Sequence, residues 1–287
     1  MSKSNNDLRH VTIIGAGLLG ASIGLAMKRR LPRVKIAGVG RRLASLRQAL
    51  RVGAIDTAHL SVGEPVPASD LVILATPVGA FEGYLREIRP LLKAGAWVTD
   101  VGSTKVQVVS AARRVLGRSG AFIGSHPMAG SERKGPAHAR ADLFEGATCV
   151  LTPSAGTPAA LVARARQFWR MLGMKVLRMR PAAHDRAVAA VSHLPHLAAA
   201  LLTVLPQDAD LAVAATGLRD MTRLAAGDPE MWRDILLTNR RELLRAIDRL
   251  GRSLTGARRL VANGDAAAIE KFLRRAKNRR DGTFGPG

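Results

Sequence analysis

The sequence predicts an α/β domain with a parallel sheet, followed by an all-α domain. In the first part of the chain, short apolar runs alternate with helical stretches. Beyond residue 180 the β-rich runs stop, and apolar residues recur at a spacing near 3.6. A chain of 287 residues can hold two such domains, which we place at residues 8–180 and 181–280.

Seven apolar runs are predicted to be strands, at residues 11–14, 34–39, 71–75, 97–101, 121–123, 148–151 and, more weakly, 175–179. The stretches between them are predicted helices, at residues 18–31, 42–51, 78–92, 104–116 and 158–172. The second domain is predicted to hold four helices, at residues 182–205, 208–226, 229–250 and 252–276. Because these helices are rich in Ala and Leu, we expect them to bury surface against a second copy, as a homodimer.

The chain is strongly basic, with 44 Lys and Arg against 22 Asp and Glu and a formal net charge of +22. Such a balance occurs in proteins that bind nucleic acids. Here the charge is spread along the chain and aromatic residues make up only 3% of it, so we expect no nucleic-acid partner. We expect instead a field that attracts small anions. The single cysteine, Cys149, excludes an internal disulfide and suits a cytoplasmic location.

Residues 11–27 carry no charge and resemble a membrane span or a signal segment. Gly15, Gly17 and Gly20, however, have the spacing of a phosphate-binding turn between a strand and a helix. The first glycine allows the tight turn, the second lets a pyrophosphate approach, and the third lets helix and strand pack. Amides at the helix start, at Leu18 and Leu19, can then bind phosphate. We therefore predict a Rossmann-type dinucleotide site and no membrane partner.

The end of the next strand decides which dinucleotide is preferred. An NAD site usually carries an acid there, which binds the ribose 2′-hydroxyl. This chain has Gly40-Arg41-Arg42 without a carboxylate, and guanidinium groups match the geometry of a 2′-phosphate. We expect NADP to be preferred and NAD to be possible. The alternative is that both arginines merely face solvent.

Two further loops follow predicted strands, with Thr76-Pro77 in one and Ser103 in the other. Ligands of open α/β sheets lie beyond the carboxyl ends of the strands. We therefore expect Thr76 and Pro77 to contact the cofactor and Ser103 to lie near the nicotinamide, with ordinary turn chemistry as the alternative for both loops.

His126 stands among small residues, in the stretch Gly-Ser-His-Pro-Met-Ala-Gly-Ser-Glu, just after a predicted short strand. We expect its imidazole to have an open face and a pKa near neutrality. Such a histidine can exchange a proton with a bound substrate at pH 7.

His193 and His196 stand three residues apart on a predicted helix and therefore share a face. Each could contact a ligand or be a buried, hydrogen-bonded histidine. With His126 and His184 they could in principle hold a metal ion, but no Glu-x-x-His pattern or cysteine pair supports this, so we expect no metal. Pro195 should kink the helix and leave a carbonyl without its donor.

A third cluster contains Arg219, Arg223 and Arg233 on predicted helices. An arginine that faces the cleft could hold a carboxylate through two hydrogen bonds. On spacing alone, solvated helix faces explain these arginines equally simply.

Together these motifs resemble those of the prephenate and arogenate dehydrogenases of tyrosine biosynthesis. The resemblance runs from about residue 10 to residue 275 and rests on five motifs: Gly-x-Gly-x-x-Gly-Ala-Ser, Asp100-Val101-Gly102-Ser103, the nine residues around His126, Ser-His-Leu-Pro-His, and Arg-Asp-x-Thr-Arg-Leu-Ala with Met-Trp-Arg-Asp. Gly40 departs from the family pattern, because many members carry an acid there.

The resemblance implies roles for the site residues. His126 would be the catalytic base that accepts the proton of a ring 4-hydroxyl, and Ser103 would orient that hydroxyl and the histidine. His196 would contact the substrate, and Arg223 would hold a substrate carboxylate. The other residues implied to line or support the pocket are Ser131, Glu132, His193 and Trp232.

The implied reaction is the oxidative decarboxylation of prephenate to 4-hydroxyphenylpyruvate, with hydride transfer to NAD(P)+. Three alternatives remain open: an arogenate dehydrogenase that gives tyrosine directly, a β-hydroxyacid dehydrogenase, and a non-catalytic protein that senses the cofactor and binds nucleic acid through its basic surface.

Overall fold

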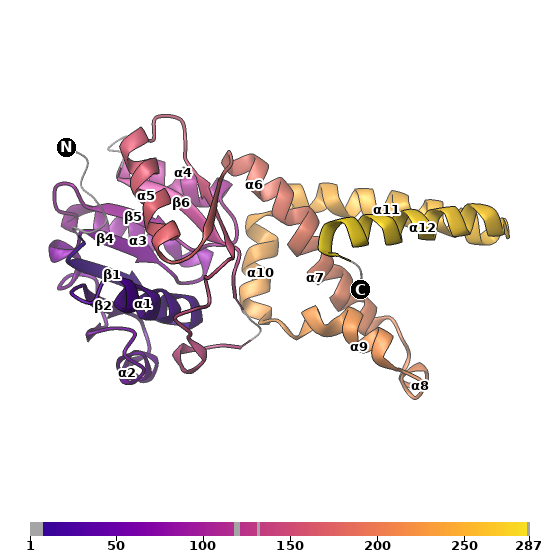
Figure 1. Ribbon diagram of the computed structural model, residues 1–287, viewed down its shortest axis with the longest axis horizontal. Coiled ribbons are helices and arrows are strands. Elements are labelled where there is room, and N and C mark those ends of the chain that lie inside the picture. The colour runs from indigo at the N-terminus through magenta and orange to yellow at the C-terminus, as the bar shows by residue number, and fades with distance from the viewer. Residues whose placement is uncertain (1–7, 118–120, 131–132, 286–287) are drawn as a thin grey trace. The chain divides into compact units, whose positions relative to one another are not determined.

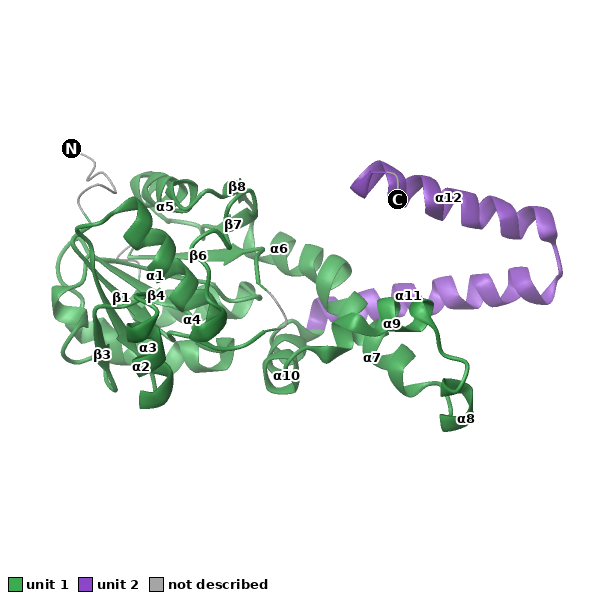
Figure 2. Ribbon diagram, turned by 60° about the horizontal axis from the view of Figure 1, so that its bottom comes forward, with its two compact units in different colours: residues 1–240 green, residues 241–287 purple. Residues whose placement is uncertain are grey.

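The computed structural model describes residues 8–117, 121–130 and 133–285 (Figure 1). These residues form two compact units, at residues 1–240 and 241–287 (Figure 2). The first unit contains the whole sheet and the helices around it, and the second consists of two long helical segments. The division at residue 180 that the sequence suggests stays a prediction.

The sheet has eight strands, in the order β3-β2-β1-β4-β5-β6-β7-β8. Their bounds are β1 His10–Ile14, β2 Lys35–Val39, β3 Thr57–His59, β4 Leu71–Leu74, β5 Trp97–Asp100, β6 Phe122–Pro127, β7 Thr148–Thr152 and β8 Lys175–Arg178. The predicted α/β fold with a mostly parallel sheet is confirmed. One pair departs from it, because β7 runs antiparallel to β6, while β8 is parallel to β7.

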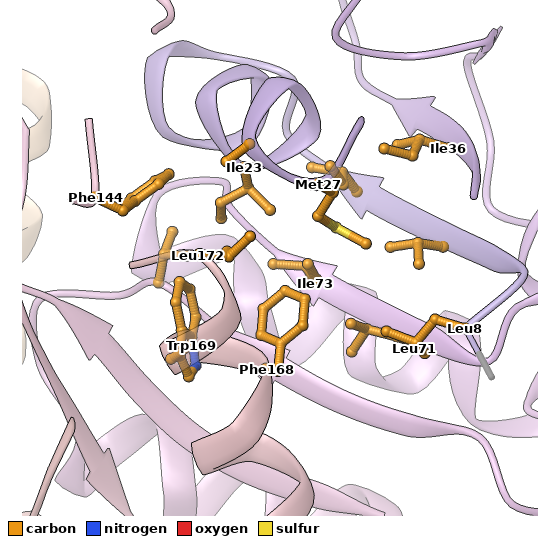
Figure 3. Packing of buried hydrophobic residues seen from close by; sticks show 14 of the residues in the cluster. Leu8, Ile23, Met27, Ile36, Leu71, Ile73, Phe144, Phe168, Trp169 and Leu172 are labelled. Carbon is orange, nitrogen blue, oxygen red and sulfur yellow. The ribbon is translucent and has the colours of Figure 1, made fainter. Parts of the chain in front are cut away.

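Helices cover both faces of this sheet. Their bounds are α1 Leu18–Arg30, α2 Leu43–Arg51, α3 Phe81–Ile88, α4 Val106–Leu116 and α5 Ala159–Met171, with short 3₁₀ segments η2 Val66–Ala68, η3 Val78–Ala80, η4 Arg89–Leu91 and η5 Pro136–His138. On one face, α1 and α5 bury Met27, Phe168 and Trp169 against the strands (Figure 3). On the other face, α3 and α4 bury a second apolar cluster. Burial on both faces explains why the central strands are continuous apolar runs.

Beyond β8 the described chain consists of helices and the loops that connect them, which confirms the predicted all-α part. The elements are α6 Pro181–Val188, the π-helix η6 Ala189–His193, α7 Leu194–Val204, α8 Asp208–Leu211, α9 Thr216–Thr222, η7 Arg223–Ala226, α10 Pro229–Thr238, α11 Arg240–Ala262 and α12 Ala266–Phe284. Within the first unit, α6 packs against α4 and β7, and α10 packs against η3. These contacts bring helical side chains to the loops that follow β4 and β5.

The expected distortion near Pro195 takes the form of a π-helical turn. Pro195 lies in the first turn of α7, directly after the π segment Ala189–His193. Because proline has no N–H, the carbonyl four residues earlier loses its usual donor. A π turn, with its wider hydrogen-bond spacing, carries the chain past such a gap and is frequent at functional sites.

One stretch of the described residues, Pro181–Val204, is long and apolar enough to cross a membrane by length and composition alone. A single stretch of this kind is weak evidence, and this one contains the buried polar side chains of His184, Asp185 and His193. Residues 11–27, which resembled a span in sequence, form part of β1 and α1 and are largely buried.

Two helix-interior glycines should respond oppositely to the same substitution. Gly24 in α1 packs so closely that an added Cβ would lie 2.1 Å from the carbonyl oxygen of Ala54, whereas a Cβ on Gly83 in α3 would meet nothing within 4 Å. We expect Gly24→Ala to lower the free energy of unfolding by about 1–3 kcal/mol, and Gly83→Ala to raise it by about 0.5–1 kcal/mol. Urea unfolding followed by circular dichroism measures both; equal effects of the two variants would contradict the packing of α1.

Candidate active site

Two glycines shape the turn between β1 and α1. Gly15 has a φ of 102°, and a Cβ on it would lie 2.6 Å from the carbonyl carbon of Ala75, just after β4. A Cβ on Gly20 would lie 2.1 Å from the carbonyl oxygen of Gly15. A side chain at either position would therefore push α1 and the loop after β4 away from β1.

The start of α1 is open to an anion. Gly17 is its N-cap residue, no side chain of the described residues caps the helix, and a Cβ on Gly17 would have nothing within 4 Å. The amides of Leu18 and Leu19 therefore point outward at the positive end of the helix dipole. This arrangement suits a phosphate group.

The loops that follow β4 and β2 carry the other residues expected to contact the cofactor. Thr76 and Pro77 directly follow β4, and the backbone nitrogen of Thr76 would lie 2.7 Å from a Cβ on Gly15. Arg41 and Arg42 follow β2, and both are exposed. The amide of Gly40 donates to the carbonyl of His59 at the end of β3.

A buried ion pair between Asp100 and Lys105 organises the loop after β5. Both side chains are 0% exposed. The Asp100 carboxylate also accepts hydrogen bonds from the amides of Gly102 (2.8 Å) and Ser125 (3.0 Å). Burial raises the pKa of Asp100, while the Lys105 ammonium opposes that rise. Ser103 is half-buried within this loop.

His126 lies on β6 rather than in a loop beyond it, because β6 continues to Pro127 and pairs with β7. Its ring is half-buried, and its Nδ1 lies 2.9 Å from Nε2 of His184. The expectation of a pKa near neutrality is wrong. Burial, together with the positive charge of Lys105 and the neighbouring His184 and His193, lowers the pKa of His126 well below 6.5.

The side chain of Asp185 joins α6 to the start of α4. Its Oδ1 accepts from the amide of Lys105 (2.7 Å), and its Oδ2 accepts from the amide of Val106 (2.8 Å). Its Oδ1 also lies 2.8 Å from Nδ1 of His184. His184 was considered in the sequence only as a metal ligand, and Asp185 not at all. The one signal for the pair is a run of three polar residues, His184, Asp185 and Arg186, in an otherwise apolar helix.

His193 is a buried, hydrogen-bonded histidine that also keeps one ring nitrogen available to a ligand. Its ring is buried, and its Nδ1 lies 3.1 Å from Nδ2 of Asn239, which also donates to the carbonyl of Asp185. An amide nitrogen only donates, so Nδ1 of His193 accepts and Nε2 carries the proton. Within the described part of the chain, that Nε2 has no hydrogen-bond partner, and burial lowers the pKa of His193 to about 4.

His196 and Trp232 form a stacked pair between α7 and α10. Their ring centroids are 3.5 Å apart and their planes differ by 9°. Burial lowers the pKa of His196. The ring of His193 meets the same Trp232 edge-on at 6.1 Å. The two histidines therefore share a face, as expected, and Trp232 covers it.

The remaining predicted residues are less closely tied to this centre. Arg223 is exposed on η7, which packs against α7. Neither Arg223 nor Ser103 forms a hydrogen bond with His126 among the residues that the structure describes. Ser131 and Glu132 lie outside the described residues. No group of three His, Cys, Asp or Glu in the described ranges is arranged to hold a metal ion.

Comparison with known proteins adds to this geometry. A family model described as prephenate dehydrogenase, nucleotide-binding domain, matches residues 23–178, and one described as prephenate dehydrogenase, dimerization domain, matches residues 180–275. A prephenate dehydrogenase of Bacillus subtilis (strain 168) is 36% identical over 282 residues, which cover 95% of this chain and 75% of the relative.

Solved structures of related dehydrogenases have a similar fold. Prephenate dehydrogenase from A. aeolicus, in complex with hydroxyphenyl propionate and NAD+, has a TM-score of 0.89 at 31% identity, covering 95% of this chain and 97% of its own. Synechocystis arogenate dehydrogenase has a TM-score of 0.82 at 30% identity, covering 96% and 99%. The family models together span most of the sequence, so the chain belongs to the prephenate dehydrogenase family.

Proposed function

We propose that this chain catalyses the oxidative decarboxylation of prephenate to 4-hydroxyphenylpyruvate, with hydride transfer to NAD(P)+. The state of His126 carries the proposal. One ring nitrogen is engaged by His184, and the lowered pKa keeps the imidazole neutral at pH 7. A neutral imidazole with one nitrogen available is what a general base requires. Family membership and the likeness to prephenate dehydrogenases support the same substrate.

The residues present fit a dinucleotide. The tight approach at Gly15 and Gly20, with open space over Gly17, forms a cradle for the pyrophosphate at the start of α1. The amides of Leu18 and Leu19 would hold the phosphates, and Thr76 and Pro77 would border the same cradle. When bound, the nicotinamide accepts the hydride.

His126 would then remove the proton from the 4-hydroxyl of the substrate while the hydrogen on that carbon leaves with its electron pair. The bond between the ring and its carboxylate breaks and carbon dioxide leaves. The electrons of that bond complete the aromatic ring and leave a phenolate, and the proton taken up by His126 returns to the phenolate oxygen, which gives the hydroxyl group of 4-hydroxyphenylpyruvate. Ser103 would orient the hydroxyl towards His126. Aromatisation makes the step irreversible, so the protein has to position the reactants and accept one proton.

Substrate binding is assigned to the helical side of the site. Arg223 would hold one carboxylate of prephenate, and His196, held flat against Trp232, would contact the other end of the molecule. His193 would offer its Nε2–H, which has no hydrogen-bond partner among the described residues.

The apolar surface of the helices supports a homodimer. Val191, Leu205 and Val213 are 70%, 70% and 85% exposed, and the matching family model is described as a dimerization domain. An exposed apolar surface of this kind favours association with a second copy. The single, buried Cys149 suits a reducing, cytoplasmic location.

Arogenate oxidation is the second candidate, favoured by the likeness to Synechocystis arogenate dehydrogenase. The two substrates differ only in a keto group and an amine on the side chain. Following NADPH and NADH formation with each substrate in turn, at equal concentrations, decides between them. A higher kcat/KM with prephenate supports the proposal, and a higher value with arogenate replaces it.

Replacing the proposed base should remove turnover while leaving binding intact. We expect His126→Asn to lower kcat by about 10²-fold or more, because asparagine cannot accept the proton, with KM for prephenate changed far less. Steady-state kinetics measures this, and His138→Asn on the exposed η5 is the matched control. Near-normal turnover by His126→Asn would remove His126 from this role.

The activity should persist into mild acid. Protonation of His126 inactivates it, and its pKa lies well below 6.5, so kcat/KM should hold as pH falls through 6.5 and decline only at lower pH. A profile of kcat/KM at constant ionic strength tests this, with folding checked at each pH. A midpoint of the acidic limb at or above 6.5 would contradict the assignment.

The preference for NADP is assigned to Arg41 and Arg42. Loss of a charge-assisted hydrogen bond costs about 1.5–3 kcal/mol, so Arg41→Gln with Arg42→Gln should lower kcat/KM for NADP by about 10-fold or more and change that for NAD less. Gly40→Asp should move the preference towards NAD, because an acid there accepts from the ribose hydroxyl and repels a phosphate. A clear preference of the unaltered protein for NAD would end this proposal.

A further inference from the structure

The proposed reaction gives no task to His184 and Asp185, yet this pair contacts the proposed base directly. His184 is 1% exposed and Asp185 is 2% exposed, so both are withdrawn from water. The three side chains form a chain of hydrogen bonds, with 2.8 Å between Asp185 Oδ1 and His184 Nδ1 and 2.9 Å between His184 Nε2 and His126 Nδ1.

The direction of each hydrogen bond follows from the atoms present. Oδ1 and Oδ2 of Asp185 each accept a backbone N–H, from Lys105 and Val106 respectively. An oxygen that already accepts offers only a lone pair to His184, so His184 Nδ1 must carry the hydrogen and donate. In a neutral imidazole the other nitrogen then has no hydrogen, so Nε2 of His184 is an acceptor.

The direction of the hydrogen bond between His184 and His126 follows from this. Because His184 Nε2 accepts, the hydrogen between the two imidazoles belongs to Nδ1 of His126. The neutral His126 ring then has its lone pair on Nε2, at the corner of the ring that His184 does not occupy. A base must present a lone pair to the proton that it removes, so this tautomer is the reactive one.

We propose that His184 is a positioning residue, which, backed by Asp185, holds His126 in its Nδ1–H tautomer and leaves Nε2 as the basic atom. The proposal rests on the proposed function of His126. The contact with His184 explains why His126 is in its Nδ1–H tautomer, and not its Nε2–H tautomer, before the substrate binds.

The same hydrogen bonds accommodate the charge that the reaction creates. The hydroxyl proton moves to Nε2 of His126, the former O–H electrons form the C=O bond as the hydride leaves, and His126 becomes an imidazolium that still donates from Nδ1. A donor that gains a charge forms a stronger hydrogen bond, and the Asp185 carboxylate lies one ring further along.

The other groups near His126 come from several elements. Lys105, before α4, is ion-paired with Asp100 of β5, while His193 of η6 and the thiol of Cys149 on β7 complete the surroundings. Burial raises the pKa of Cys149 well above its usual value, so that thiol is uncharged. Asp185 is therefore the carboxylate that His184 connects to the base.

Variants of His184 can show whether this residue positions His126 or only contributes to the stability of the fold. Asp185 caps α4, so its replacement risks the fold, whereas the His184 side chain forms its hydrogen bonds in the described ranges with side chains alone. His184→Gln keeps a donor for Asp185 and an acceptor for His126 in one carboxamide, and His184→Leu removes both. His138→Gln on η5 makes the same chemical change at an exposed position and is the control.

We expect His184→Leu to lower kcat by about 10²-fold with little change in KM, and His184→Gln to restore most of that loss. In His184→Gln the acidic limb of kcat/KM should move to higher pH, because a neighbour that can carry positive charge is gone. A merely structural residue would move thermal stability but not this limb. The control should match the unaltered protein throughout.

The tautomer itself can be observed without any substrate. In protein labelled with ¹⁵N-histidine, long-range ¹H–¹⁵N spectra at neutral pH should show His126 with a protonated Nδ1 and an unprotonated Nε2, and His184→Leu should lose that preference. A protonated Nε2 on His126 in the unaltered protein would overturn the proposal, as would full kcat and an unmoved pH profile in His184→Leu. Because these spectra need no turnover, absence of prephenate oxidation would refute the proposed function and leave the tautomer result standing.

Discussion

The carboxylate of Asp185 joins the sheet domain to the helical elements of the first unit. It reaches from α6 to the first two amides of α4, which have no partner within their own helix. The backbone carbonyl of Asp185 accepts a hydrogen bond from the side chain of Asn239 at the end of α10. A carboxylate at a helix N-terminus also meets the positive end of the helix dipole. Three separate helices therefore share one residue, and its neighbour His184 contacts His126 on β6.

Through Asp185, the start of helix α4 and the tautomer of His184 depend on the same carboxylate. If Asp185 were lost, α4 would lose its cap, and His184 would lose the acceptor that fixes its tautomer. A buried, partly satisfied polar network is costly, whereas a fully satisfied one rigidifies its surroundings. The buried pair Asp100 and Lys105 lies at the same helix start, so charge there is balanced within the loop. His126 consequently lies among neutral or paired groups, and burial rather than a neighbouring acid determines its pKa.

Much of the fold could be predicted because its signals are local. Alternating apolar runs gave seven of the strands, and the glycine spacing placed the turn at Gly15 before α1. β3 was missed because Thr57–His59 has three residues and no apolar run. The extension of β6 through His126 was missed because proline usually ends a strand, and because pairing with β7 depends on residues far along the chain. The site was harder to predict for the same reason, since the contact of His184 with His126 joins residues 58 positions apart.

A neutral base has a consequence for how the site would attract its ligands. Prephenate and a dinucleotide both carry negative charge, but the base has to be uncharged to accept a proton, and Lys105 is committed to Asp100. Under the proposed function, positive charge for binding would come from exposed arginines such as Arg41, Arg42 and Arg223. Guanidinium groups do not lose their charge at any pH where the protein is folded. Because these arginines are separate from the base, they would attract anions without further disfavouring the protonated form of His126. The net charge of +22 would attract anions from the surrounding solvent in the same way.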